Sequence, residues 1–181
     1  MERIASDGKT FLVGYHTQEW RASMVLEKPI LCNASNAWLG IGYYFWTEVE
    51  FAHYWGRDSK TRTGSYNVYR AYLDIEKCLN AVFDEKGYFF FRKQVDKAIA
   101  FLKKQGYSQV TLRQVHQFLA DKIWPETAIR GIIYDDLPKN PKGKSHVNSE
   151  VEPLYYKKRI QVVLFDVLDV FYFEIFLEEQ S

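Results

Sequence analysis

The chain has 181 residues and a formal net charge of +1, and 47% of its residues are hydrophobic. This length and composition predict one globular domain with a substantial core, and they exclude a disordered chain. The near-neutral charge provides no overall field for nucleic acid or an anionic membrane, and no apolar run is long enough to span a bilayer. Aromatic residues make up 17% of the chain, which favours either a ligand that stacks on rings or a bulky core.

Cysteine usage and the first residues indicate the cellular compartment. Cys32 and Cys78 are the two cysteines, and the sequence has no CxxC motif and no paired histidine spacing. Neither a zinc site nor a disulfide framework is therefore predicted, and no metal is expected. Residues 1–7 lack the apolar core of a signal peptide, so we expect a cytoplasmic protein with reduced thiols.

The first predicted elements are a strand, a short helix and a loop. The segment from Thr10 to His16 is rich in β-forming residues and predicts a strand. The segment from Trp20 to Glu27 is typical of a short helix that Pro29 would end. From there to Leu39 the sequence has no clear period, and we interpret it as a loop over a pocket.

The stretch from Gly40 to Trp55 is the most informative part of the chain. Gly40 and Gly42 allow a sharp turn or a close approach of the backbone to a ligand, and Tyr43–Trp46 is typical of a short strand. Thr47 is a good N-cap for a following helix whose first residues are acidic. The pattern indicates one wall of a pocket for a flat ring; taken alone, it also fits a well-packed aromatic core.

The middle of the chain predicts a strand followed by two helices. Tyr66–Glu76 alternates as a strand does, and Lys77–Asp84 is interpreted as a turn region. A helix is expected over Tyr88–Gln105 and ends at Gly106, and Thr111 would cap a second helix that Pro125 ends. The helical segment at about 85–125 offers no obvious site residues, and its His116 is expected to pack rather than to react.

The last third of the sequence predicts three strands, and the last two carry strong signals. Arg130–Asp136 is expected to be a strand, Leu137–Val151 a loop whose lysines are solvated, and Arg159–Asp166 and Asp169–Phe176 two further strands. No internal repeat and no domain linker interrupts the sequence, so we expect residues 1–181 to form a single domain.

Three short blocks resemble one family in the order that the family requires. The run Gly40-Ile41-Gly42-Tyr43-Tyr44-Phe45, with Ala52 and Tyr54 beyond it, resembles the nicotinamide-pocket segment of ADP-ribosyltransferases of the diphtheria-toxin and poly(ADP-ribose) polymerase type. That family also has a histidine on an earlier strand and a polar residue, usually Glu, at the start of a late strand. His16 and Gln161 occupy these two places, so the triad is His-Tyr-Gln where the family has His-Tyr-Glu.

The resemblance implies a fold and a set of site residues. The fold would be α+β: a split β-sandwich of two antiparallel sheets with peripheral helices and a two-helix insertion. His16 would bind a ribose hydroxyl of NAD, the backbone of Thr17 would hold the nicotinamide carboxamide, and Gln161 would accept a hydrogen bond from the nicotinamide ribose. Tyr44 would stack on the nicotinamide and Tyr54 would close its other face. The resemblance places the remaining NAD-binding positions at Gly42, Tyr43 and Ala52.

Two departures from the family pattern bear on activity. Gln161 is a hydrogen-bond acceptor without charge and is no base, which argues against chain elongation and leaves mono-ADP-ribosylation. Phe51 stands where the polymerase branch has a serine that bonds the carboxamide. A separate base for the target nucleophile could be Glu152 or Asp166, which are near in sequence only.

The resemblance therefore implies an NAD-dependent mono-ADP-ribosyltransferase that uses NAD as its substrate. Small members of this type are often intracellular toxins or antiphage effectors, which would add an antitoxin as a partner. The alternative is a catalytically weak pseudoenzyme that binds NAD or ADP-ribose. The target, protein or nucleic acid, stays open, because the following local bases are either a phosphate-binding face or scattered surface charge: Arg57, Lys60, Arg62, Lys139, Lys142, Lys144, Lys157, Lys158 and Arg159.

Overall fold

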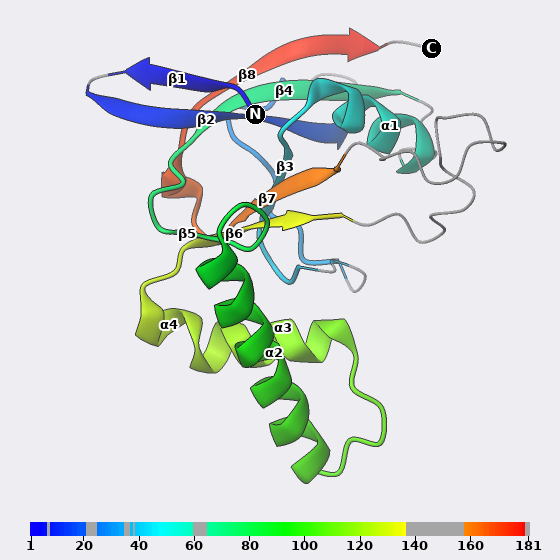
Figure 1. Ribbon diagram of the computed structural model, residues 1–181. Helices are drawn as coiled ribbons and strands as arrows, with labels where there is room; N and C mark the ends of the chain where they lie inside the picture. Colours follow the sequence, from blue (N-terminus) through cyan, green and yellow to red (C-terminus); the bar gives the residue numbers. More distant parts are fainter. Residues whose placement is uncertain are drawn as a thin grey trace, which may run out of the picture.

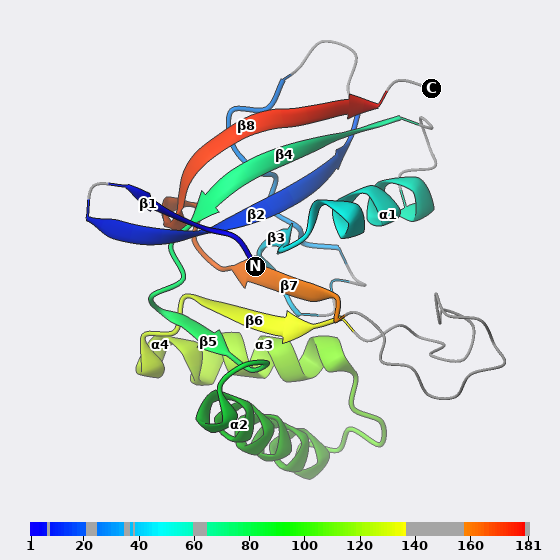
Figure 2. The same cartoon turned by 45° about the horizontal axis from the view of Figure 1, so that its top comes forward.

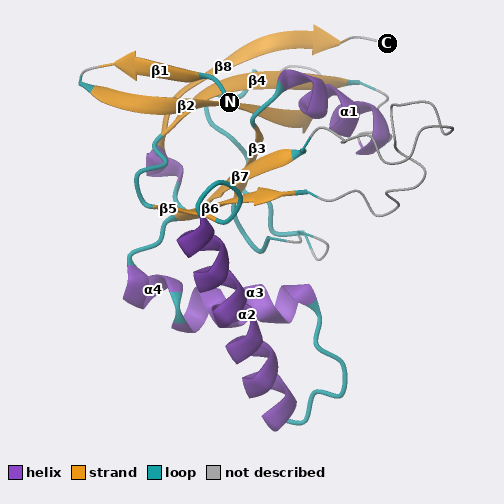
Figure 3. Ribbon diagram, viewed as in Figure 1, coloured by secondary structure: helices purple, strands orange, loops and turns teal. Residues whose placement is uncertain are grey.

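In the computed structural model (Figure 1), the described residues are 1–6, 8–20, 25–34, 37, 39–59, 65–136 and 158–179. They form a mixed α+β fold, with one mostly antiparallel sheet of eight strands and four α-helices within these ranges (Figure 3). The strands are β1 Arg3–Ser6, β2 Lys9–Glu19, β3 Tyr43–Trp46, β4 Tyr66–Leu73, β5 Cys78–Asn80, β6 Gly131–Asp135, β7 Ile160–Leu164 and β8 Val170–Glu179. The helices are α1 Val49–Ser59, α2 Glu85–Lys104, α3 Leu112–Lys122 and α4 Trp124–Thr127, with a 3₁₀ turn at Val167–Asp169.

The sheet runs in the order β5-β6-β7-β3-β2-β4-β8, and β1 adds to β2. The expected α+β class is confirmed, but the strands hydrogen-bond into one sheet rather than into the two separate sheets expected. The reason is a narrow join: β2 and β3 share a single residue pair, Tyr15 with Trp46. The ladders between β2, β4 and β8 on one side of this join are long, as Figure 2 shows, whereas those between β3, β7, β6 and β5 on the other side are shorter.

An apolar cluster packs strands from both sides of this join against each other, β2 and β4 from one side and β3, β6 and β7 from the other. It contains Leu12 from β2, Phe45 from β3, Leu73 from β4, Ile133 from β6 and Val162 from β7, each almost completely buried. Burial of such side chains stabilises the fold by about 1.5–3 kcal/mol each. The cluster therefore holds the narrow join in place although only one residue pair crosses it.

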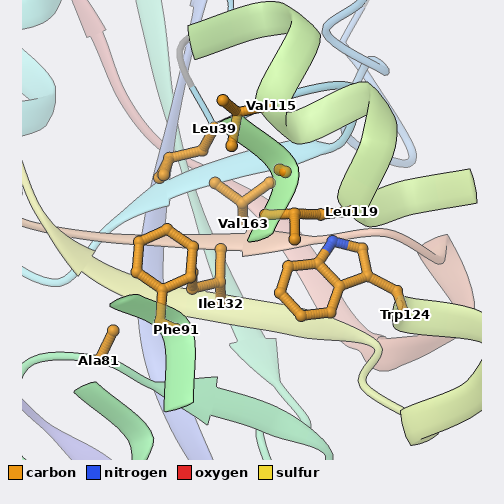
Figure 4. Close-up of a cluster of buried hydrophobic side chains, with 9 residues drawn as sticks. Leu39, Ala81, Phe91, Val115, Leu119, Trp124, Ile132 and Val163 are labelled. Carbon is orange, nitrogen blue, oxygen red and sulfur yellow. The ribbon is translucent and has the colours of Figure 1, made fainter. Parts of the chain in front are cut away.

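The helices α2 and α3 cover β6 and β7 and begin at well-formed caps. The Asp84 side chain accepts hydrogen bonds from the first-turn amides of α2, and Thr111 with Gln114 forms a capping box on α3. Figure 4 shows the apolar contact below them, where Phe91 of α2 lies beside Ile132 and Val163 of the sheet. Helix α1 packs separately, against β2, β3 and β4.

Most of the expected elements in the described ranges are present, with small shifts at their ends. The strand at Thr10–His16 extends to Lys9–Glu19, and the helix expected over Tyr88–Gln105 is Glu85–Lys104. Helix α1 begins at Val49, so Thr47 is not at its N-cap and is instead buried. Gly106 adopts the positive φ of 91° that ends a helix, as expected.

Four expectations differ from the structure or fall outside the described residues. Lys77–Asp84 contains a short strand, β5, that pairs in parallel with β6, and Pro125 does not end the helical region but opens α4 at its first turn. Trp20 and residues 25–27 are not helical, and residues 21–24 of that expected helix lie outside the described residues. The expected loop at Leu137–Val151 also lies outside them. None of the described helices has the length and apolar character needed to cross a membrane.

His116 should make the stability of the protein fall in acid. Its side chain is 3% exposed and lies beside the ring of Phe91, and burial lowers its pKa from the usual 6.5 to about 4. Between these two values the unfolded chain binds a proton that the folded chain does not. The contribution of His116 is therefore complete above about pH 6.5 and is lost as the pH falls towards 4, by about 3 kcal/mol.

The measurement is urea unfolding of the wild type and of His116→Leu at pH 7 and pH 4.5. The drop in unfolding free energy between the two pH values should be smaller in the variant by about 2–3 kcal/mol, because leucine binds no proton. An equal drop in both proteins would show that His116 is protonated in the folded state at its ordinary pKa.

Candidate functional site

A cavity of about 210 Å³ opens at the join between β2 and β3 and contains all three residues of the expected triad. Its lining residues come from β2, β3, β7, the middle of α1, the segment at 30–32 and Ala37; they are His16, Thr17, Gln18, Ile30, Leu31, Cys32, Ala37, Tyr44, Trp46, Trp55 and Gln161. Most of this lining is apolar or aromatic, with a few polar groups, which is the usual composition of a small-molecule site.

The strand register explains why these residues meet. Trp46 pairs with Tyr15 of β2 on one side and with Gln161 of β7 on the other. Had the β2–β3 ladder continued, Thr17 would lie opposite Tyr44, but the strands separate after the single pair. The cavity occupies this gap. Tyr44 and Trp46 both line it because alternate residues of a strand share a face.

His16 is fixed by a hydrogen bond across the same gap. Its ring is buried, and its Nδ1 atom lies 2.9 Å from the carbonyl oxygen of Tyr44. A carbonyl can only accept, so Nδ1 carries the proton and donates it. The rings of Phe45 and Phe173 lie 5.7 Å and 6.0 Å from the imidazole, measured between centroids. The backbone thus sets both the orientation and the protonated nitrogen of His16.

Tyr44 is held by its hydroxyl group. That hydroxyl donates to the carbonyl of Gly40 at 2.6 Å and accepts from the amide of Leu39 at 3.1 Å. Burial is the main cause that raises the pKa of Tyr44 well above its usual value of 10, so the phenol stays neutral. With its hydroxyl anchored in the backbone, Tyr44 presents a ring of fixed orientation to the cavity.

Three of the other expected NAD-binding positions have structural roles at or beside the cavity. Thr17 lines the cavity, and its hydroxyl donates to the carbonyl of Ala52 at 2.8 Å, which joins β2 to α1. Ala52 itself is fully buried and does not line the cavity. A Cβ on Gly42 would lie 2.5 Å from a methyl group of Val163, so glycine is required there by contact with β7.

The backbone of Gly42 has a further role in closing the cavity. It exchanges two hydrogen bonds with Cys32, at 2.9 Å and 3.1 Å. This isolated bridge holds the segment at 30–32 against the start of β3, where Ile30, Leu31 and Cys32 form part of the lining. Gly42 therefore shapes the site through the backbone and not by contact with its contents.

The aromatic residues around the cavity differ in part from those expected. Tyr43 packs with the apolar cluster on the other face of β3, and Tyr54 is 40% exposed and lies under the guanidinium of Arg57. Neither lines the cavity. The rings that do so beside Tyr44 are Trp46 and Trp55, which the sequence reasoning missed. The two-residue spacing of Tyr44 and Trp46 was a usable signal for the first of them.

The cavity is electrically neutral in the described part of the chain, because its lining there contains no carboxylate, lysine or arginine. A charge next to one lining residue is that of Arg159, which lies over the rings of Trp46 and Phe51 and forms an ion pair with Asp136 at 3.0 Å. Phe51 is buried in the cluster under α1 and does not reach the lining.

Asp166, one of the two expected candidates for a base, does not line this cavity. Asp166 forms an ion pair with Arg130 at 3.0 Å and lines a different cavity, and Glu152 lies outside the described residues. Of the local bases considered for a target-binding face, Arg57, Lys158 and Arg159 are described, and the other six are not. Within the described ranges no group of three or more His, Cys, Asp or Glu side chains could hold a metal ion.

Comparisons of the chain with protein-family models, with curated proteins and with solved structures gave no match.

The anchored hydroxyl of Tyr44 can be tested without removing its ring. In Tyr44→Phe the Leu39 amide loses its acceptor, and a buried polar group left without a partner costs about 1–3 kcal/mol. We expect the unfolding free energy to fall by this amount and the Leu39 amide to exchange faster with solvent. Denaturant unfolding and amide hydrogen exchange measure the two effects.

Tyr43→Phe is the matched control, because it removes the neighbouring hydroxyl from the same strand on the opposite face. It should change the unfolding free energy by less than about 0.5 kcal/mol. Equal effects of the two substitutions would contradict the anchoring role of the Tyr44 hydroxyl.

Proposed function

We propose that the chain is an NAD-dependent mono-ADP-ribosyltransferase that transfers ADP-ribose from NAD to a macromolecular target and releases nicotinamide. We further propose that it acts as an intracellular toxin or defence effector, which makes an antitoxin a partner. The observation that carries the proposal is the cavity where β2, β3 and β7 meet. It collects His16, Tyr44 and Gln161 from three separate parts of the sequence. These are the residues that the family resemblance selected.

The chemistry of this transfer fits a neutral aromatic cavity. When the bond between nicotinamide and ribose breaks, its electron pair goes to the ring nitrogen, which becomes neutral, and positive charge develops on the ribose. The nicotinamide ring would lie against Tyr44, whose orientation is fixed by Leu39 and Gly40. The amide oxygen of Gln161 would accept a hydrogen bond from the ribose 2′-hydroxyl. A preorganised polar contact of this kind stabilises the transition state.

The size and charge of the cavity favour single transfer to a target over chain growth. A volume of about 210 Å³ fits the nicotinamide and its ribose, so the adenosine half of NAD would lie outside it. The described lining contains no carboxylate that could deprotonate an acceptor. We therefore assign the activation of the nucleophile to a group outside this lining, and we expect hydrolysis of NAD by water to be slow.

The fold-level part of the proposal concerns the narrow join in the sheet. The strands β1, β2, β4 and β8 would correspond to one sheet of the family's split sandwich, and β3, β5, β6 and β7 to the other. The single pair Tyr15–Trp46 would then be a local bridge between the two sheets. The helices α2 to α4 would be the insertion.

A second candidate is a pseudoenzyme that binds NAD or ADP-ribose without turnover. The observation that favours it is the neutral lining, in which Gln161 stands where the family has a charged Glu. It predicts that NAD raises the melting temperature while no nicotinamide is released during incubation with a cell lysate. Release of nicotinamide with labelling of a lysate component would exclude it.

Substitutions of Gln161 distinguish the transferase from the pseudoenzyme. Gln161→Ala should lower nicotinamide release and target labelling by roughly 10²–10³-fold, because a contact made in the transition state is lost. Gln161→Glu restores a charge that stabilises the oxocarbenium state, so NAD hydrolysis should rise, while transfer to the native target stays equal or falls. The measurement is nicotinamide release from NAD, together with labelling of a lysate by NAD labelled in its ADP-ribose part.

Gln109→Ala is the matched control, since Gln109 is an exposed glutamine in the connection between α2 and α3 and does not line the cavity. Its activity should equal that of the wild type. Thermal melts establish that each variant is folded. If Gln161→Ala, Gln161→Glu and Gln109→Ala all behave as the wild type does, Gln161 is not a site residue.

The class of target follows from the same labelled sample. One portion of the labelled lysate is digested with nuclease and another with protease, and the release of label from each portion is measured. Release by protease alone identifies a protein target, and release by nuclease alone identifies a nucleic acid.

A further inference from the structure

A second, larger cavity of about 430 Å³ lies between the helices α3 and α4 and the segment that leads into β3. Its volume is within the range of roughly 300–1,000 Å³ that is usual for small-molecule sites. Ala37 lines both this cavity and the first one, so the two cavities adjoin at this residue. The residues of the expected triad do not line it.

One end of this second cavity is aromatic. Trp124 of α4 and Phe165, just after β7, line it with rings 6.1 Å apart and inclined by 19° to each other. Figure 4 shows the Trp124 ring beside Leu119 of α3. Trp124 is 6% exposed, so its ring has a fixed position. A flat ring placed here would find aromatic and aliphatic contact.

The helix α3 supplies the polar side of the cavity. Arg113, His116, Gln117 and Ala120 all line it, and their spacing places them on one face of the helix. His116 is neutral above about pH 4 because burial lowers its pKa. The amide of Gln117 donates to Asp121. Arg113 is therefore the charged group that this face presents.

Three charged side chains in the described part of the chain line this cavity: Arg113, Arg130 and Asp166. Arg130 and Asp166 have ion-pair partners, and Arg113 has none within the described residues. Arg130 forms ion pairs with Asp166 and Asp169, each at 3.0 Å. Arg113, by contrast, is exposed and forms no ion pair or hydrogen bond with any part of the chain that the structure describes. An anionic group beside Arg113 would gain a charge-assisted hydrogen bond without breaking an existing one.

The distance between the two ends limits the shape of a ligand. Seven residues separate Arg113 from Ala120, which corresponds to about 10 Å along the helix axis, and Trp124 lies beyond Ala120. A ligand that uses both ends needs a spacer between its ring and its anion. We propose that this cavity binds a small molecule in which a flat aromatic ring is joined through a short linker to one anionic group. The ring would rest against Trp124 and Phe165, and the anion would contact Arg113.

Two kinds of molecule share this chemistry, and the experiment separates them. Adenosine 5′-monophosphate and indole-3-butyrate are titrated into the full chain by calorimetry, each beside its uncharged counterpart, adenosine or indole-3-butanamide. At least one anion should bind with one-to-one stoichiometry and at least tenfold more tightly than its counterpart, because only the anion contacts the guanidinium. The anion that binds shows whether the cavity prefers a nucleoside phosphate or an aromatic carboxylate.

Three variants locate the binding. Arg113→Gln should weaken binding of the anion about tenfold and leave its uncharged counterpart unchanged. Ala120→Phe should abolish binding of both, because its ring fills the cavity. Lys122→Gln is the matched control: it removes an exposed cation from the same helix outside the lining and should change nothing.

Absence of binding by both anions would overturn the proposal. Binding that survives Arg113→Gln and Ala120→Phe would do the same, because it would place the molecule elsewhere. Should Ala120→Phe not fold, the Arg113→Gln variant and the uncharged counterparts still decide the question. All of these readouts are independent of nicotinamide release, so the result does not depend on the proposed transferase activity.

Discussion

The narrow join between β2 and β3 is the constraint on which the rest of the molecule depends. One residue pair, Tyr15 with Trp46, crosses it, and beyond this pair the strands separate. The separation would leave the Tyr44 carbonyl without a strand partner on this side, and the imidazole of His16 donates to it instead. An unsatisfied buried carbonyl costs about 1–3 kcal/mol, so the histidine stabilises the gap that it lines. The first cavity and the position of His16 thus have the same cause.

Local signals in the sequence predicted the elements of the fold but not how they join. Thr111 could be predicted as a cap because its hydroxyl accepts from a helix amide only three residues away in the sequence. The three residues of β5 carry no comparable signal, since their strand exists through pairing with β6, more than fifty residues away. Whether β2 and β3 share a pair depends on packing around Phe45 and Leu12, which no local pattern records.

The family resemblance selected the candidate site residues, and among them Tyr43 on β3 and Tyr54 on α1 do not line the first cavity. His16, Tyr44 and Gln161 lie on strands, and all three line the first cavity. On α1, a residue that differs by one position points about 100° away around the axis. Trp55 therefore lines the cavity while Tyr54 is directed to Phe51 and Arg57. Gly42 shows a second reason why the sequence predicts the site only in part. A glycine indicates that another group lies close to its backbone, but it does not indicate which group, and at Gly42 that group is the Val163 side chain.

The segment between the two cavities links their geometry through Tyr44. Its hydroxyl is bonded to Leu39 and Gly40, and these two residues also line the second cavity. Gly40 has a φ of +84°, and a Cβ there would lie 3.1 Å from the Cβ of His116, so the segment packs closely against α3. A molecule that displaces Leu39 or Gly40 must either carry the Tyr44 hydroxyl with them or break its hydrogen bonds. The orientation of the Tyr44 ring in the first cavity is therefore set in part by the wall of the second.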